Sequence, residues 1–312
     1  VLDEFGNPVP GVQVQFAVSD TPSGAVGQSV GSGQVTSDSD GIAQTTLTLG
    51  DITGTYVVTV SASGTSSVLF SAVATASAAS TFTFDPISSP QTAGQPFGIR
   101  ITALDSQGNI ATGYQGTAAL STGSGSIIPV EANFANGIAS LDVSLSAAGQ
   151  GQSIVATDGS ITGTSGTFDV QSGGVSTSNS TVSVSPSTLQ AGQTASLIIE
   201  VRDGSNNLIS GLSDGDFTVT VSGNAQAGNV NEDSAGIYSA NITNETAESV
   251  NVTVQADGVA LNDTPTVNFT AANAANISIV SGNNQTGSVT QQLAADFMVN
   301  ISDVFGNNVP SE

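Results

Sequence analysis

The sequence predicts an all-β protein in which similar sandwiches follow one another along the chain, and three observations support this. Many segments alternate apolar and polar side chains with a period of two, the pattern of a strand that covers a core on one face. Gly, Asn, Asp and Ser, which favour turns, separate these segments. The same landmarks also recur about every 100 residues, which indicates a tandem repeat.

The repeat is defined by three landmarks with similar spacing. Asp turns begin at Asp3, Asp105, Asp203 and Asp303, which are 102, 98 and 100 residues apart. Gly-Ile pairs begin at Gly41, Gly137 and Gly236, and an Ala-Gly-Gln triplet occurs at 93–95 and 191–193. A unit of about 100 residues has the size of an immunoglobulin-like β-sandwich.

Two strands are predicted in each complete unit. The strand near the Asp turn alternates as Val12, Val14, Phe16 and Val18, or as Phe97, Ile99 and Ile101, or as Leu197, Ile199 and Val201, or as Phe297, Val299 and Ile301. A further strand is expected after each Gly-Ile pair, beginning with Ala43, Ala139 and Tyr238. No amphipathic helix is predicted.

These landmarks predict sandwiches arranged end to end. The expected domains are a sandwich over 1–78 that lacks its first strands, two complete sandwiches over 79–174 and 175–272, and the opening strands of a further sandwich over 273–312. Two interpretations fit the incomplete units. The chain is a window on a longer array, or the tail of one chain completes the head of the next by strand addition, giving a head-to-tail homopolymer.

The composition excludes many kinds of chemistry. The net charge is −23, the cations are Arg100 and Arg202, and His, Cys, Lys and Trp are absent. A Ser-His-Asp triad, a cysteine nucleophile, zinc or haem ligation and a lysine Schiff base are therefore impossible. Nucleic acid is disfavoured as a partner by charge, and no apolar run is long enough for membrane insertion.

One stretch carries a resemblance to a known family. Residues 3–16 read DEFGNPVPGVQVQF, and they are followed by a G-x-A strand at 41–49 and a G-x-Y strand at 54–60. This order closely resembles bacterial immunoglobulin-like (Big) domains of the invasin and intimin type. The resemblance implies an extracellular or cell-surface stalk of an adhesin or filament, and it supplies no receptor-binding site.

No catalytic, cofactor-binding or metal-binding residue is assigned. Residues 36–41 (TSDSDG) resemble half a calcium loop, but Thr36 and Leu47 stand where such a loop needs Asp and Glu, so a turn is expected. Residues 214–216 and 231–233 are interpreted in the same way. Calcium at the expected linkers, 77–80, 173–176 and 271–275, remains an alternative.

The tyrosines and asparagines receive structural interpretations. Tyr56 and Tyr238 are expected in cores, and Tyr114 is expected to cap a loop. The Asn-x-Ser/Thr sequons are expected mainly on polar strand faces, with glycosylation as the alternative. They begin at Asn179, Asn241, Asn244, Asn251, Asn262, Asn268, Asn276, Asn284 and Asn300.

The resulting hypothesis is a stiff spacer in a bacterial surface adhesin or extracellular fibre. Its partners would be neighbouring units of the same protein, with an unknown host or surface ligand. A carbohydrate- or protein-binding module is the alternative, and a carbohydrate-active enzyme is a more distant one because aromatic residues are only 5% of the chain.

Overall fold

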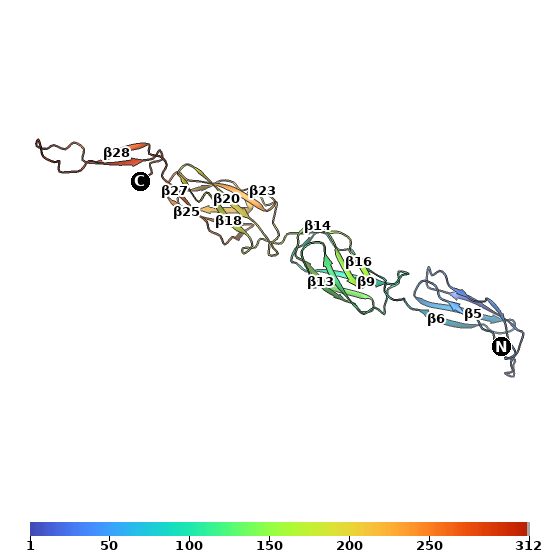
Figure 1. Ribbon diagram of the computed structural model, residues 1–312. Helices are drawn as coiled ribbons and strands as arrows, with labels where there is room; N and C mark the ends of the chain where they lie inside the picture. The colour runs from blue at the N-terminus through green and yellow to red at the C-terminus, as the bar shows by residue number, and fades with distance from the viewer. Residues whose placement is uncertain (311–312) are drawn as a thin grey trace. The chain divides into compact units, whose positions relative to one another are not determined.

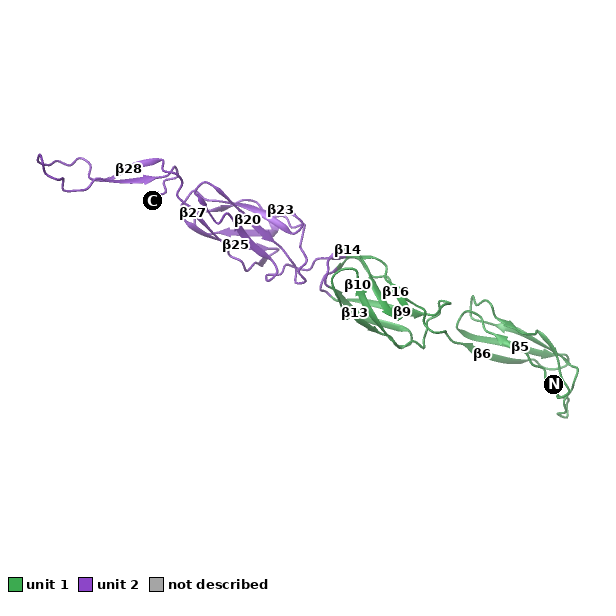
Figure 2. Cartoon of the chain, viewed as in Figure 1, with its two compact units in different colours: residues 1–91, 96–145, 150–169 green, residues 92–95, 146–149, 170–312 purple. Residues whose placement is uncertain are grey.

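A computed structural model describes residues 1–310, and these residues form almost only strands and turns. Within them, the single helical element is a 3₁₀ turn, η1 (Asp214–Asp216). None of the described residues forms a helix with the length and apolar character needed to cross a bilayer. The chain divides into two compact units, 1–91 with 96–145 and 150–169, and 92–95 with 146–149 and 170–312 (Figure 2).

The third sandwich, in the second unit, has two facing sheets (Figure 1). One sheet has the order β18 (Thr181–Ser185), β20 (Thr194–Glu200), β24 (Ile237–Thr243) and β22 (Gln226–Ala227), with β23 (Asn231–Ser234) also on β24. The other has the order β19 (Thr188–Gln190), β27 (Thr266–Thr270), β25 (Ser249–Ala256) and β21 (Phe217–Val221), with β26 (Val259–Ala260) on β25.

Strict alternation builds the core of this sandwich. Val250, Val252 and Val254 on β25 are buried while the residues between them are exposed, and Leu197 and Ile199 on β20 face them from the other sheet. Burying each such side chain stabilises the fold by about 1.5–3 kcal/mol. The period of two in the sequence therefore corresponds to a core that lies between two sheets.

The second sandwich also consists of two sheets, a larger one and a smaller one. Its larger sheet has the order β11 (Ile127–Ile128), β13 (Ile138–Leu145), β9 (Phe97–Leu104), β7 (Thr81–Phe84), β16 (Ile161–Thr164), β15 (Ile154–Asp158), β10 (Thr117–Thr122) and β12 (Glu131–Asn133). A smaller sheet has the order β14 (Gly149–Gln152), β17 (Phe168–Gln171) and β8 (Gln91–Thr92). The opening strand β7 pairs antiparallel with β9 and parallel with β16.

The first sandwich lacks the counterparts of β7 and β9 among the described residues. One sheet has the order β3 (Gln34–Thr36), β1 (Gln13–Asp20), β5 (Gly54–Ala62) and β6 (Val68–Ala74), and a short pair joins β2 (Ser29–Val30) to β4 (Leu47–Thr48). Its buried core consists of Val14, Val58 and Val60 with half-buried neighbours.

The predicted strand after the Gly-Ile pair is confirmed in two sandwiches and wrong in the first. It forms β13 and β24, each paired with the strand that precedes the Asp turn. After Gly41, only Leu47–Thr48 is extended in a sheet. Among residues 1–310, no strand lies beside this segment as β9 lies beside β13.

The last segment is a hairpin of β28 (Asn276–Ser281) and β29 (Met298–Ser302), as the sequence predicts for an opening pair. Ile277 and Ile279 pair with Ile301 and Val299, and all four side chains are exposed. In Figure 1 no further sheet faces this hairpin.

Replacing Tyr238 by Phe should destabilise the third sandwich by about 1–3 kcal/mol. The fully buried Tyr238 hydroxyl donates to the Ile209 carbonyl oxygen at 2.8 Å and accepts from the Leu212 N–H at 3.2 Å. Both backbone groups would lose this partner. Urea unfolding of the variant measures the loss, with Ser239→Ala on the opposite face of β24 as control; equal midpoints for the two variants would contradict the assignment.

Candidate functional site

The Asp turn has one local structure in all four copies. In the third copy, Asp203 Oδ1 accepts hydrogen bonds from the N–H groups of Ser205 at 2.9 Å and Asn207 at 2.8 Å. The Asp203 N–H donates to the Asn207 carbonyl oxygen at 2.9 Å. The same bonds recur at Asp3, Asp105 and Asp303. One carboxylate oxygen therefore shapes the turn.

The other carboxylate oxygen holds the linker that enters each sandwich. Asp105 Oδ2 accepts from the Ser77 N–H at 3.0 Å, Asp203 Oδ2 from Gly173 at 2.8 Å, and Asp303 Oδ2 from Ala272 at 2.8 Å. All three donors lie in the expected linkers, 77–80, 173–176 and 271–275. Both oxygens of each carboxylate thus accept hydrogen bonds from backbone N–H groups.

At the last three Asp turns, the Asn side chain four residues after the Asp hydrogen-bonds to the backbone of a turn that comes earlier in the chain. Asn207 Oδ1 accepts from the Ala148 N–H at 3.0 Å, and Asn207 Nδ2 donates to the Ser146 carbonyl oxygen at 2.7 Å. Ser146–Gly149 belongs to the same compact unit as Asn207. A carboxamide offers one acceptor and donors side by side, so it can bind two backbone groups at once.

This two-bond contact repeats at the other two junctions. Asn109 accepts from Thr53 N–H at 3.1 Å and donates to the Asp51 carbonyl oxygen at 2.8 Å. Asn307 accepts from Ala247 N–H and donates to the Glu245 carbonyl oxygen, both at 2.8 Å. We call the Asp, the Asn four residues later and the gripped turn the junction clamp.

The side chain two residues after Asp adds a packing contact. At Gly192, a Cβ would lie 2.5 Å from Cζ of Phe305, and at Gly94 it would lie 3.1 Å from Oγ of Ser205. Both glycines have positive φ, +84° and +74°. The Ala-Gly-Gln landmark is therefore a glycine turn on which the next Asp turn rests.

Burial and hydrogen bonding act in opposite directions on the clamp carboxylates. Asp105, Asp203 and Asp303 are 3%, 1% and 0% exposed. Burial alone would raise each pKa, but the N–H donors from the linker, the turn and the Asn side chain outweigh it and lower each pKa below the ordinary value. The clamps are therefore built around ionised carboxylates.

The first Asp turn is formed but grips nothing among the described residues. The Asn7 side chain bonds only to Asp3, and that contact lowers the pKa of Asp3. Phe5 is 80% exposed, whereas Phe305 at the same position is 40% exposed. The bonds within residues 3–7 therefore suffice to shape the turn.

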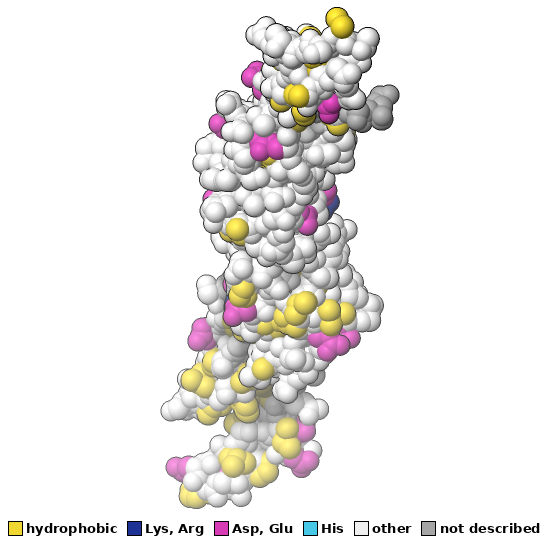
Figure 3. All heavy atoms as spheres, turned by 90° about the vertical axis from the view of Figure 1, so that its left-hand side faces the viewer, with side chains coloured by type: hydrophobic (Ala, Val, Ile, Leu, Met, Phe, Trp, Pro, Cys, Tyr) yellow, Lys and Arg dark blue, Asp and Glu magenta, His cyan; other side chains and the backbone are white. Residues whose placement is uncertain are grey.

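Residues 38–41 and 214–216 form turns, as predicted, whereas 231–233 is part of strand β23, so the turn predicted there is wrong. Asp38 Oδ1 accepts from the N–H groups of Asp40 and Ile42, and Asp216 caps η1 through Ser213. Glu232 accepts from the N–H groups of Gly211 and Gly236. Residues 1–310 contain no group of three or more acidic side chains placed to hold a metal ion, and acidic side chains are scattered over the face in Figure 3.

The three tyrosines have structural roles. Tyr56 and Tyr238 are fully buried, which confirms the core prediction, and the Tyr56 hydroxyl donates to the Ile52 carbonyl oxygen at 2.7 Å. Tyr114 lies in the loop before β10, where it packs on Phe82 and Phe134. Burial, aided by its hydrogen bond to Asp158, raises the Tyr114 pKa.

The sequon asparagines are more varied than the predicted polar strand faces. Asn241, Asn251 and Asn268 do lie exposed on strands. Asn244 is 4% exposed and donates to Glu248. Asn179 and Asn276 donate to the carbonyl oxygens of Asp203 and Asp303 and so brace the clamps.

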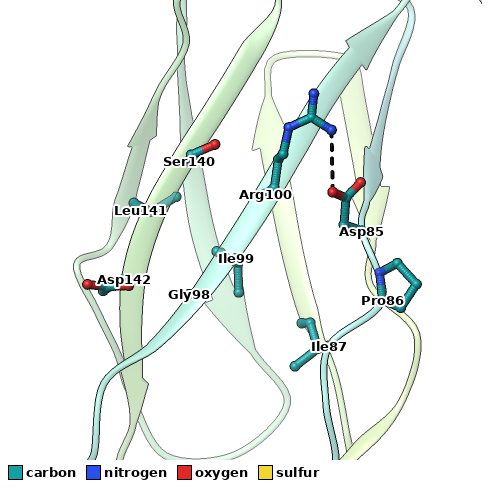
Figure 4. A pocket seen from close by; sticks show the side chains of 9 residues that line it. All are labelled: Asp85, Pro86, Ile87, Gly98, Ile99, Arg100, Ser140, Leu141 and Asp142. Carbon is teal, nitrogen blue, oxygen red and sulfur yellow. Dashed lines mark hydrogen bonds and ion pairs between the residues drawn. The ribbon is translucent and has the colours of Figure 1, made fainter.

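A hollow in the second sandwich surrounds Arg100 and has a volume of about 530 Å³ (Figure 4). Arg100 Nη1 pairs with Asp85 Oδ2 at 3.3 Å, and both side chains are largely exposed. Asp142 also lines the hollow, but in Figure 4 its carboxylate points away from Asp85. The two carboxylates do not face each other as a glycosidase pair would.

The third sandwich matches a known protein family. Residues 176–272 match the family model described as invasin, domain 3. The third sandwich is therefore similar to that domain of invasin. The invasin-type immunoglobulin-like repeat that the sequence resembles is thereby confirmed, together with the all-β sandwich fold. No curated protein matches the chain in sequence.

Solved structures include similar tandem domains. FdeC, an adhesin of Escherichia coli, is 20% identical, with a TM-score of 0.52 over 86% of this chain and 89% of that one. Invasin, a bacterial integrin-binding protein, is 17% identical (TM-score 0.46, 90% and 58% covered). InvD of Yersinia pseudotuberculosis is 16% identical (TM-score 0.42, 73% and 71% covered). At this identity the FdeC likeness supports the fold.

Opening of the clamp can be measured at Arg202, which directly precedes Asp203. The Arg202 guanidinium is held by Glu200 and by the Asn206 carbonyl oxygen at 2.7 Å. Asn207→Ala removes the two-bond grip and should increase trypsin cleavage after Arg202 about tenfold, because losing the grip costs about 1–2 kcal/mol of local stability.

Cleavage after Arg100, the other trypsin site, is the internal control and should not change. Asn268→Ala on an exposed strand face is the matched variant and should resemble the unchanged protein. Equal cleavage after Arg202 in Asn207→Ala and Asn268→Ala would contradict the role assigned to Asn207.

Acid should loosen the clamps. Because the folded-state pKa of Asp105 is lowered, its charge stabilises the junction above the ordinary Asp pKa of about 4, and this contribution is lost as the pH falls through the lowered value. The distance distribution between spin labels in the first and second sandwiches should therefore be narrow at pH 7 and broad near pH 2.

Asp105→Asn is the control for this titration. An amide cannot supply two acceptor oxygens for the donors at Asp105, so the variant should already be broad at pH 7. A distance distribution between the spin labels that is narrow at both pH values, in the unchanged protein and in Asp105→Asn, would contradict a role for the charge of Asp105.

Proposed function

We propose that this chain is a stiff spacer segment of a bacterial surface adhesin, located outside the cell. The observation that carries the proposal is the junction clamp, which occurs with the same atoms at Asn109, Asn207 and Asn307. A spacer needs limited bending between units, and two hydrogen bonds from one planar side chain restrain both hinge and twist at a joint.

The surrounding chemistry supports a mechanical role over a catalytic one. The chain has no His, Cys or Lys, and its clamp carboxylates are committed to N–H donors. The invasin-type third sandwich and the likeness to the adhesin FdeC support a surface adhesin. The partners of each unit would be its neighbours in the same protein.

A carbohydrate- or protein-binding module has weaker support. Its expected signature is a groove with clustered, exposed aromatic rings. The largely exposed Phe side chains of residues 1–310 are Phe5, Phe70, Phe297 and Phe305. Phe5 and Phe305 belong to Asp turns, and Phe70 and Phe297 lie on surfaces whose counterparts in complete sandwiches are covered.

We also propose that copies of the spacer join head to tail by strand complementation. Among residues 1–310, no opening hairpin lies on the core of the first sandwich, and the hairpin over 276–302 exposes its apolar side chains. The two features are complementary halves of one sandwich.

The spacer proposal predicts an extended particle whose joints depend on the clamp asparagines. Small-angle scattering at low concentration should give a maximum dimension several times the cross-section, and Asn109→Ala with Asn207→Ala should broaden the distribution of interatomic distances. The matched control is Asn241→Ala with Asn268→Ala, which removes two exposed carboxamides away from the joints. A compact particle, or equal effects of the two pairs, would refute the proposal.

A further inference from the structure

We propose that the residue two positions after the clamp Asp sets how firmly a joint is held, and that a ring at this position requires a glycine in the turn on which it rests. The inference rests on the proposed function, because it concerns the joints of a spacer. It makes the joint that contains Phe305 firmer than the joint that contains Ser205. We call them the Phe305 joint and the Ser205 joint.

The turns that receive these two side chains have the same backbone structure. Ala93 and Ala191 are both buried, and the N–H of each donates at 2.8 Å to a carbonyl oxygen of β17 or β27. The Gln two residues later closes each turn with a backbone hydrogen bond of 3.1 Å. Gly94 and Gly192, which lie between them, have φ of +74° and +84°. The joints therefore differ in what packs on these turns.

A ring rests on one glycine and a hydroxyl group on the other. A Cβ at Gly192 would lie 2.5 Å from Cζ and 2.7 Å from Cε2 of Phe305, so the tip of the ring covers the glycine. A Cβ at Gly94 would lie 3.1 Å from Oγ of Ser205. A phenyl ring removes much more apolar surface from water than a hydroxymethyl group does. The Phe305 joint therefore gains more from burial.

The ring and the clamp Asn act on one connected surface. The Gly192 N–H donates to the Asn244 carbonyl oxygen at 2.8 Å, and the next carbonyl group, that of Glu245, accepts from Asn307 Nδ2 at 2.8 Å. Phe305 and Asn307 belong to the same Asp turn, so both leave this surface when the joint opens. Packing of the ring therefore also protects the hydrogen bonds of Asn307.

The linkers of the two joints differ in the same direction. The N–H that donates to the clamp carboxylate belongs to Gly173 at the Ser205 joint and to Ala272 at the Phe305 joint, at 2.8 Å in both. Gly173 is followed by Gly174, whereas Ala272 is followed by Asn273. Glycine loses more backbone freedom than other residues when a joint closes. The Ser205 joint thus combines the smaller contact with the more flexible linker.

The ring contact also selects the turn that it can meet. Any side chain at position 192 would occupy the space of the ring tip, and the positive φ of Gly192 is itself unfavourable for other residues. Ser205 makes a smaller demand, because its hydroxyl group can rotate away from an added Cβ. Phe305 therefore discriminates between units with and without a glycine at this turn.

Hydrogen exchange at single backbone amides measures the two joints separately. The Ala148 N–H donates to Asn207 and the Ala247 N–H donates to Asn307, so each amide exchanges when its own clamp opens. In the unchanged chain, Ala148 should exchange about tenfold faster than Ala247 after correction for intrinsic rates. Equal rates, or faster exchange at Ala247, would overturn the proposed order of the joints.

Ser205→Phe should transfer the ring contact to the weaker joint. We expect exchange at Ala148 to slow about fivefold while exchange at Ala247 stays the same. Ser205→Ala is the matched control: it supplies no ring, so it should not slow exchange at Ala148. If Ser205→Phe leaves exchange at Ala148 unchanged or makes it faster, the role of this position is refuted.

Gly192→Ala tests the requirement for glycine. It should speed exchange at Ala247 about tenfold in the unchanged chain, and much less in Phe305→Ser, where no ring has to move. Gly94→Ala introduces similar backbone strain without a ring, so its effect on Ala148 should also be smaller. An equal effect of Gly192→Ala with and without the ring would contradict selection of glycine by Phe305.

These outcomes can be told apart from those of the spacer proposal. The scattering test of the spacer depends on Asn109 and Asn207, which none of these variants changes. Failure of the exchange experiments would leave the two-bond contacts of those asparagines in place. A compact particle in scattering would refute the spacer whatever the exchange rates are.

Discussion

The structure depends on one constraint: an ionised carboxylate placed inside a junction must have both oxygens satisfied by donors. At Asp203, turn N–H groups take one oxygen, and the linker N–H and the Asn207 carboxamide take the other. Leaving such a group unpaired would cost several kcal/mol. The turn, the linker and the orientation of Asn207 are therefore fixed together, and the Asn207 carboxamide is held toward the backbone of Ser146 and Ala148.

In the first sandwich, one segment has no strand partner among residues 1–310. The segment after Gly41 has the composition of a strand, but it remains irregular over Gly41–Thr46, whereas the comparable segment after Gly137 forms β13. The backbone of a strand needs a neighbour for its hydrogen bonds. The same absence exposes Phe70 on a surface that would be a core in a complete unit.

Much of the fold could be predicted from the sequence because alternation and turn residues are local signals. The period of two located β9 and β20, and the inward phases of the strands placed Tyr56 and Tyr238 in cores. The irregular Gly41–Thr46 segment was mispredicted because local pattern carries no information on an absent neighbour. The role of Asn207 was missed because its partners lie about 60 residues away, although the recurrence of Asn four positions after every Asp was a visible signal.

The clamp asparagine hydrogen-bonds only to main-chain atoms of the turn that it contacts. The carbonyl groups that accept from Asn109, Asn207 and Asn307 belong to Asp51, Ser146 and Glu245, three chemically different residues. Side-chain identity in that turn is thus free to drift without altering the joint. A gene encoding such units can be lengthened, shortened or recombined by whole modules, and each new neighbour inherits a working hinge restraint.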